Sequence, residues 1–213
     1  CGKFGGDANG LLRANGGNPL VPGYSGAGGG GRIAVNYSQL DTEYAVRFSA
    51  APGTADWASL DPTNRWHSLA QPGTVWWPDT QLLSTTLDNT RFAGAVSIAG
   101  VSSWAPNSLM VSNCTVIIGE NNVVLTVAND VVVERGGTLG IGAYRARTNS
   151  TLLCGGSLIL TNGGILQVMA GASNNAGMAY GALVGVTNML YVGPGSRVYP
   201  ACFWTNGAAP LFR

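Results

Sequence analysis

Charged side chains are scarce in this sequence. Asp, Glu, Lys and Arg make up 10% of its 213 residues, and the net charge is +1, whereas about 25% is usual for globular proteins. Nucleic-acid binding requires a concentrated basic face. The chain has one lysine, Lys3, and its ten arginines are scattered from Arg13 to Arg213. We therefore expect no nucleic-acid partner.

The sequence also lacks long apolar runs and metal-binding motifs. No run reaches the roughly 18 residues of a membrane-spanning helix, and no secretory leader opens the chain. The cysteines, Cys1, Cys114, Cys154 and Cys202, form no C-x-x-C pair, and the one histidine, His67, has no cysteine near it in sequence. Because zinc sites carry recognisable ligand spacing, we expect no metal site, no cofactor and no membrane span.

Glycine is abundant instead, with 32 residues, and 46% of the chain is hydrophobic. Few charges with many Gly, Asn, Thr and Val residues favour extended strands and tight turns over helices, whose exposed faces normally carry Glu and Lys. A chain of this length can bury one substantial core. The composition predicts a single elongated all-β domain.

The densest glycine stretch, "GAGGGGRIAV" from Gly26 to Val35, invites comparison with phosphate-binding loops. A dinucleotide fold needs G-x-G-x-x-G between a strand and a helix, and a P-loop needs Gly-Lys-Ser/Thr. Here the glycines precede Arg32 and the strand-like "IAVNY". No helix would present its N-terminus to a phosphate. We interpret the stretch as tight corners and close backbone packing, with Arg32 at the surface.

The C-terminal half contains an internal repeat. "LTVANDVVVERGGTLGI" (125–141) aligns without gaps on "LLCGGSLILTNGGILQV" (152–168), 27 residues later, and that copy aligns on "VGVTNMLYVGPGSRVYP" (184–200), 32 residues later. Upstream, "LMVSNCTVIIG" (109–119) resembles the same unit shortened by one residue. Alternating apolar positions give each short strand one core face, and the Asn-Asp, Asn-Gly-Gly and Pro-Gly segments supply corners.

Units of this length are typical of a β-solenoid, in which each unit forms one coil stacked on the next. Because Cys154 aligns with valines, we predict a small buried core residue with a free thiol. The longer second spacing predicts that segment 170–181 bulges out between coils. The predicted ladders of equivalent positions are Val127, Cys154 and Val186; Val131, Leu158 and Leu190; and Leu139, Leu166 and Val198.

Several segments carry a family resemblance. "SGAGGGGRIAVNY", "VWWPDTQLLSTTL", "SSWAPNSLMVSN", "LTVANDVVV", "GGSLILTNGGILQV" and "GALVGVTNMLYV" resemble segments of very large, Gly-rich, repetitive proteins predicted to be exported by bacteria of the Planctomycetes and Verrucomicrobia group. The resemblance implies a right-handed parallel β-helix of the autotransporter and adhesin kind, at the cell surface or outside the cell. It also implies an internal segment of a longer chain, which fits a start at Cys1 without a leader. The family has no established catalytic residues to carry over.

The middle of the chain differs from its flanks. We divide one elongated domain into Gly-rich coils (1–49), a Trp- and Pro-rich loop or insertion continuing into the solenoid (50–106), and regular coils (107–213). Tryptophans in the middle part either form a sugar-stacking platform or seal a loop onto the solenoid. Since Trp76 and Trp77 are adjacent, at least one should face the core. The tryptophans are Trp57, Trp66, Trp76, Trp77 and Trp104.

The same region holds a group of acid and base side chains. They could serve a β-helix polysaccharide lyase or glycoside hydrolase, but the Asp-Asp, Asn-Thr-Asp-Gly and Gly-His-Gly motifs are missing. We therefore expect a structural or adhesive protein without enzymatic activity, whose partners are the rest of a longer chain or other copies end to end. A carbohydrate-binding module and a carbohydrate-active enzyme are the alternatives. The candidate residues are Asp56, Asp61, Arg65, His67 and Asp79.

Overall fold

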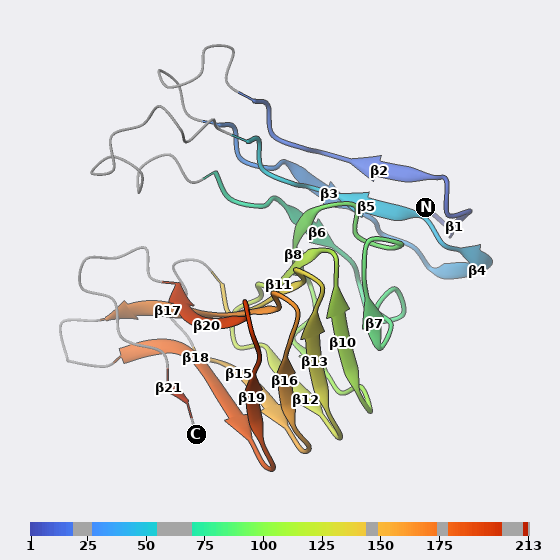
Figure 1. Cartoon of the computed structure of the whole chain (residues 1–213). Helices are drawn as coiled ribbons and strands as arrows, with labels where there is room; N and C mark the ends of the chain where they lie inside the picture. Colours follow the sequence, from blue (N-terminus) through green and yellow to red (C-terminus); the bar gives the residue numbers. More distant parts are fainter. Residues whose placement is uncertain (19–26, 55–69, 144–148, 174–178, 202–210, 213) are drawn as a thin grey trace.

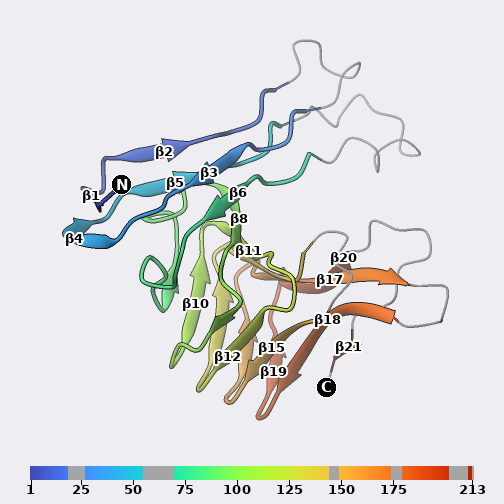
Figure 2. The same ribbon diagram turned by 180° about the vertical axis from the view of Figure 1, so that it is seen from behind.

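The computed structural model describes residues 1–18, 27–54, 70–143, 149–173, 179–201 and 211–212. These residues form strands joined by turns and loops, and no helix occurs among them (Figure 1). The predicted all-β class is confirmed. The strands at the N-terminal end and the strands around the C-terminus lie at opposite ends of the molecule, which Figure 2 shows from behind.

Nearly all strand pairing is parallel and joins each strand to the one about three places later in the chain. Three long ladders result. The first contains β7 (Thr86–Leu87), β10 (Leu109–Ser112), β13 (Val131–Glu134), β16 (Leu158–Leu160) and β19 (Leu190–Val192). The second contains β3 (Arg32–Ala34), β6 (Thr74–Trp76), β8 (Ala95–Ala99), β11 (Thr115–Ile118), β14 (Thr138–Ile141), β17 (Ile165–Ser173) and β20 (Arg197–Ala201). The third contains β9 (Ser103–Trp104), β12 (Val124–Val127), β15 (Ser150–Cys154), β18 (Ala179–Val186) and β21 (Leu211–Phe212).

The first two triplets of strands follow the same order. β1 (Lys3–Gly6) pairs with β4 (Gln39–Tyr44), β2 (Leu11–Arg13) pairs with β5 (Arg47–Ser49), and β3 pairs with β6. The described parts of segment 50–106 contribute β6 to β9. The chain is therefore an all-β stack of long parallel sheets, an arrangement compatible with a β-solenoid.

The register of these ladders matches the sequence repeat. All three predicted ladders are confirmed as Cα partners in neighbouring strands, for example Val131 with Leu158 and Leu158 with Leu190. The shortened upstream unit is confirmed as well, because Leu109 pairs with Val131 and Thr115 pairs with Thr138. The corner between β10 and β11 is thus one residue shorter than the corner between β13 and β14.

Inward positions build a continuous apolar interior. Leu139, Leu158 and Leu166 are fully buried, and the core cluster runs along the stack from Val35 to Val184. Because successive side chains of a strand point to opposite faces, every second residue of each strand points into the interior. Cys154 is buried in this interior with a free thiol, as predicted. Burial of apolar rows against the coils above and below is the main stabilising force of the stack.

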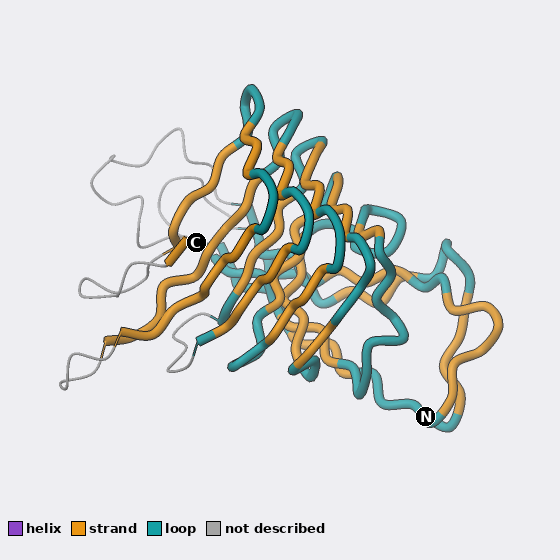
Figure 3. Tube along the Cα trace, turned by 90° about the horizontal axis from the view of Figure 1, so that it is seen from below, coloured by secondary structure: helices purple, strands orange, loops and turns teal. Residues whose placement is uncertain are grey.

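Tight corners stack above one another. Arg135 and Gly136 both have positive φ (50° and 68°), as do Asn162 and Gly163 (49° and 78°) one coil later. Two successive residues with positive φ define a type I′ turn, which favours Gly and Asn. Figure 3 shows that turns of successive coils lie in rows along the stack. The Asn-Gly-Gly corner predicted from sequence is confirmed.

Segment 170–181 differs from the simple bulging loop that the repeat predicts. β17 and β18 continue past the coil and pair antiparallel, with Ala170 opposite Gly181 and Ser173 opposite Ala179. Backbone N–H and C=O groups that leave the stack need new partners. The antiparallel pairing of β17 with β18 provides these hydrogen-bond partners.

The glycine-rich stretch packs backbone against backbone. Segment 28–31 lies among segments 14–17, 50–53 and 71–74 and bonds to all three: the N–H of Gly28 donates to Gly17 O (2.9 Å), that of Gly53 to Gly28 O (2.8 Å) and that of Gly30 to Gln71 O (3.0 Å). Arg32 is exposed. The architectural interpretation of these glycines is supported, because a Cβ on Gly30 would lie 2.0 Å from the carbonyl oxygen of Ala50.

Replacing Gly30 by Ala should therefore lower the free energy of unfolding by about 1–3 kcal/mol, the usual cost of overpacking. Gly29 is a matched control, since the nearest atom to a Cβ there, Gln71 O, is 3.7 Å away. We expect Gly29→Ala to be neutral or to stabilise slightly by restricting the unfolded chain. Chemical denaturation of the two variants measures the difference, and equal midpoints would contradict the close packing of segment 28–31.

Candidate functional site

The described tryptophans occupy different environments. Trp77 is completely buried, with its ring centroid 5.2 Å from that of Phe48 at an interplanar angle of 70° and 6.2 Å from that of Phe92. The expectation that one residue of the Trp76–Trp77 pair faces the core is confirmed. Trp77 therefore has no face to offer a sugar. Trp76 and Trp104 are partly exposed, while Trp57 and Trp66 lie outside the described residues.

Of the five acid and base candidates, Asp79 lies within the described residues, and Asp56, Asp61, Arg65 and His67 lie outside them. Asp79 accepts hydrogen bonds from the Tyr37 hydroxyl (2.6 Å) and from the backbone and side-chain nitrogens of Gln81 (2.9 and 2.8 Å). Burial opposes ionisation, but these bonds outweigh it and hold the pKa of Asp79 below its usual range. Burial and the contact with Asp79 raise the pKa of Tyr37.

Asp79 is thus an ionised acceptor that ties its loop to Tyr37, a buried member of the apolar core. Its hydrogen bonds fix a turn and a cross-coil contact. A general acid would instead need a raised pKa.

The buried cysteines are inert thiols. Burial raises the pKa of Cys114 to about 12, and its Sγ lies 3.5 Å from the carbonyl oxygen of Leu87. Burial also raises the pKa of Cys154. Since the thiolate is the nucleophile, neither group is activated at neutral pH. In the described part of the chain, no three His, Cys, Asp or Glu side chains are grouped so as to hold a metal ion.

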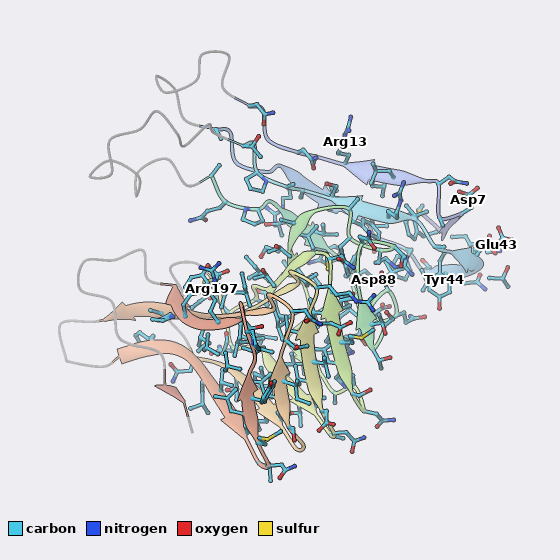
Figure 4. The ribbon with its side chains drawn as sticks, in the orientation of Figure 1. Asp7, Arg13, Glu43, Tyr44, Asp88 and Arg197 are labelled. Carbon is cyan, nitrogen blue, oxygen red and sulfur yellow. The ribbon has the colours of Figure 1, made fainter. Side chains whose placement is uncertain are left out.

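An open depression of about 550 Å³ lies at the N-terminal end, lined in part by Asp7, Glu43, Tyr44 and Arg91. Figure 4 shows Asp7, Glu43 and Tyr44 gathered near the outer ends of β1 and β4. The Arg91 guanidinium donates to the backbone carbonyls of Tyr44 and Val46 and lies 5.6 Å from the Tyr44 ring centroid. Its role is therefore to fasten the β4–β5 turn.

The sequence argument missed this depression. Its lining residues come from three segments that are far apart in sequence, 7–8, 42–45 and 91. No repeat or motif marks them. Two carboxylates beside one immobilised arginine do not by themselves constitute a catalytic or binding site.

The last described strand of the first ladder, β19, and the residue before it carry a row of exposed apolar side chains. Met189, Leu190, Tyr191 and Val192 are each 45–48% exposed, whereas the equivalent Leu158, one coil earlier, is fully buried. Among the described strands, β19 comes last in the first ladder, and β21 comes last in the third, where Leu211 and Phe212 pair with Leu183 and Val184 of β18.

Among the described residues, no helix is long and apolar enough to cross a membrane. Comparisons of the chain with protein-family models, with curated protein sequences and with solved structures returned no match. The functional argument therefore rests on the stack of coils itself.

Proposed function

We propose that this chain is a right-handed parallel β-helix that serves as a structural or adhesive segment of a large exported bacterial repeat protein. The observation that carries the proposal is the set of in-register parallel ladders around one continuous apolar interior. A coil of this kind cannot bury its apolar face alone, so its stability comes from stacking. Each added coil lengthens the stack by one strand spacing of about 4.8 Å.

The handedness follows from strand twist. A strand, a connection and a second parallel strand in the same sheet form a right-handed crossover in about 98% of cases. Each pair of neighbouring coils repeats that unit, as in the passage from β13 through β14 and β15 to β16. The same twist applied to successive coils favours a right-handed solenoid.

The exported location is supported by the resemblance of the glycine-rich and repeat segments to exported proteins and by the low charge of the chain. The test is antibody labelling. An antibody against the purified chain should label intact, unpermeabilised source cells or detect the chain in the medium. An antibody against a cytoplasmic protein serves as the control for lysis. Labelling confined to permeabilised cells would contradict the proposed location.

A further inference from the structure

Trp76 lies on the outer surface of the second ladder. Its neighbours in the chain, Val75 and Trp77, are fully buried, and successive side chains of a strand point to opposite faces. The Trp76 side chain therefore points away from the interior, and it is partly exposed. Trp104, by contrast, packs against the buried core. Among the described tryptophans, Trp76 is thus the one that presents its ring outward.

Small residues surround this ring. Ala34 and Ala99 are the Cα partners of Trp76 in the two adjacent strands, so their side chains share its outer face. Gly100 follows directly, and a Cβ there would lie 2.6 Å from the Trp76 Nε1 and 2.9 Å from its Cδ1. The five-membered edge of the indole is therefore packed against the Gly100 backbone. This contact holds the ring in place, and the two alanine methyl groups are too short to cover it.

Polar groups of both charge signs frame the indole ring. Arg32, Thr74 and Ser97 form the next outward column, in register across β3, β6 and β8, and alternate residues of a strand lie about 6.6 Å apart. Figure 1 shows these three strands side by side. On the other side of the ring, the Glu120 carboxylate accepts a hydrogen bond from the N–H of Gly100 at 2.8 Å. A guanidinium donor and a carboxylate acceptor therefore lie on opposite sides of one outward aromatic ring.

We propose that this surface binds a neutral polysaccharide, with one pyranose ring stacked on the Trp76 indole and its hydroxyl groups bonded to Arg32 and Glu120. The inference rests on the proposed adhesive role and names its ligand. An indole ring packs on the apolar C–H face of a pyranose. Arginine donates to sugar oxygens, and a carboxylate accepts from sugar hydroxyls. The two charges balance, so a neutral sugar fits better than a uronate, whose carboxylate would lie beside Glu120.

The setting of the ring favours a polymer over a free sugar. Trp76 lies on the outer face of three parallel strands, so a stacked unit keeps both of its glycosidic linkages clear of the protein. One indole with few polar partners binds a single sugar weakly. A polysaccharide compensates, because it presents many equivalent units to the same site and to neighbouring protein molecules.

Solid-phase binding to immobilised polysaccharides tests the site. The neutral probes are hydroxyethyl cellulose, β-1,3-glucan and glucomannan, and polygalacturonate is the acidic comparison. The wild-type chain should bind at least one neutral probe, and Trp76→Ala should weaken that binding about tenfold or more with little change in the thermal transition. The matched control is Tyr199→Ala, which removes a 39% exposed aromatic side chain from β20 of the same ladder. It should leave binding unchanged.

Two further variants test the polar contacts. Arg32→Gln and Glu120→Gln should each weaken binding several-fold, and the glutamine at position 120 keeps an oxygen that can accept from the Gly100 N–H. Thermal transitions of all variants confirm folding. Failure of the wild-type chain to bind any of the three neutral probes would overturn the proposal, as would undiminished binding by Trp76→Ala or a preference for polygalacturonate. None of these outcomes affects the antibody test of location or the stacked coils, which Leu158→Asp tests separately.

Discussion

Leu158→Asp should lower the free energy of unfolding by about 3–5 kcal/mol, because it places an unpaired charge in the interior of the stack. Leu158 is fully buried between Val131 of the previous coil and Leu190 of the next. No basic side chain belongs to the buried core around it. The carboxylate would have to remain protonated or open the coil, and either outcome destabilises the folded state.

The matched control is Thr161→Asp. Thr161 directly follows β16, and its N–H donates to Val133 O at 3.0 Å, a backbone bond that the substitution leaves in place. We expect a loss of less than about 1 kcal/mol for this partly exposed position. Urea denaturation of the two variants beside the wild type measures the difference. Equal losses of unfolding free energy for the two variants would contradict the placement of Leu158 in the interior of the stack.

Trp77→Ala should cost about 3–5 kcal/mol, the range of large-to-small substitutions of buried aromatic residues. The Trp77 ring packs between Phe48 and Phe92 at the junction of the N-terminal strands and the regular coils. Its removal would leave a cavity that two rigid aromatic neighbours cannot fill. The half-exposed neighbour Trp76 provides the comparison, and Trp76→Ala should cost clearly less.

Trp77→Phe separates packing from hydrogen bonding. The buried indole Nε1 of Trp77 has no hydrogen-bond partner among the described residues, and an unsatisfied buried donor carries a penalty. Phenylalanine removes that donor and keeps most of the ring, so the loss should be far smaller than for alanine. Thermal denaturation of Trp77→Ala, Trp77→Phe and Trp76→Ala checks the expected order of their stability losses. A Trp77→Ala transition close to that of the wild type would place the ring outside the core.

The sequence predicted most of the regular coils, because the repeat aligns equivalent positions directly. Val127, Cys154 and Val186 occupy one ladder in the sequence alignment and in the structure. Stacked coils bury equivalent positions in every coil. The alignment of the sequence repeats therefore also gives the residue pairs between neighbouring strands. The first ladder and the Asn-Gly-Gly corner follow from the same periodicity.

The irregular parts could not be predicted in this way. The pairing of Tyr37 with Asp79 joins residues 42 positions apart that belong to no repeat. The antiparallel ribbon of β17 and β18 depends on where departing backbone groups find partners, which alternation does not show. The pairing of Leu211 and Phe212 with Leu183 and Val184 adds a short strand, β21, beside β18. A strand of two residues has no sequence signal of its own.

The central claim is the register of neighbouring coils, and disulfide formation between introduced cysteines tests it directly. Val132 and Ile159 are Cα partners on the outer faces of β13 and β16, at the strand spacing of about 4.8 Å that suits a disulfide. Cys1 and Cys202 are first replaced by serine, whereas the raised pKa values of Cys114 and Cys154 leave those thiols unreactive.

Under mild oxidation, the Val132→Cys/Ile159→Cys chain should form its disulfide rapidly and quantitatively. The control, Val132→Cys/Thr161→Cys, places the second cysteine two residues along the same outer row, beyond the preferred separation. Mass spectrometry of the oxidised, alkylated chains gives both rates. The account predicts faster closure for the pair at positions 132 and 159. Equal or faster closure for the pair at 132 and 161 would contradict the stacked-coil register.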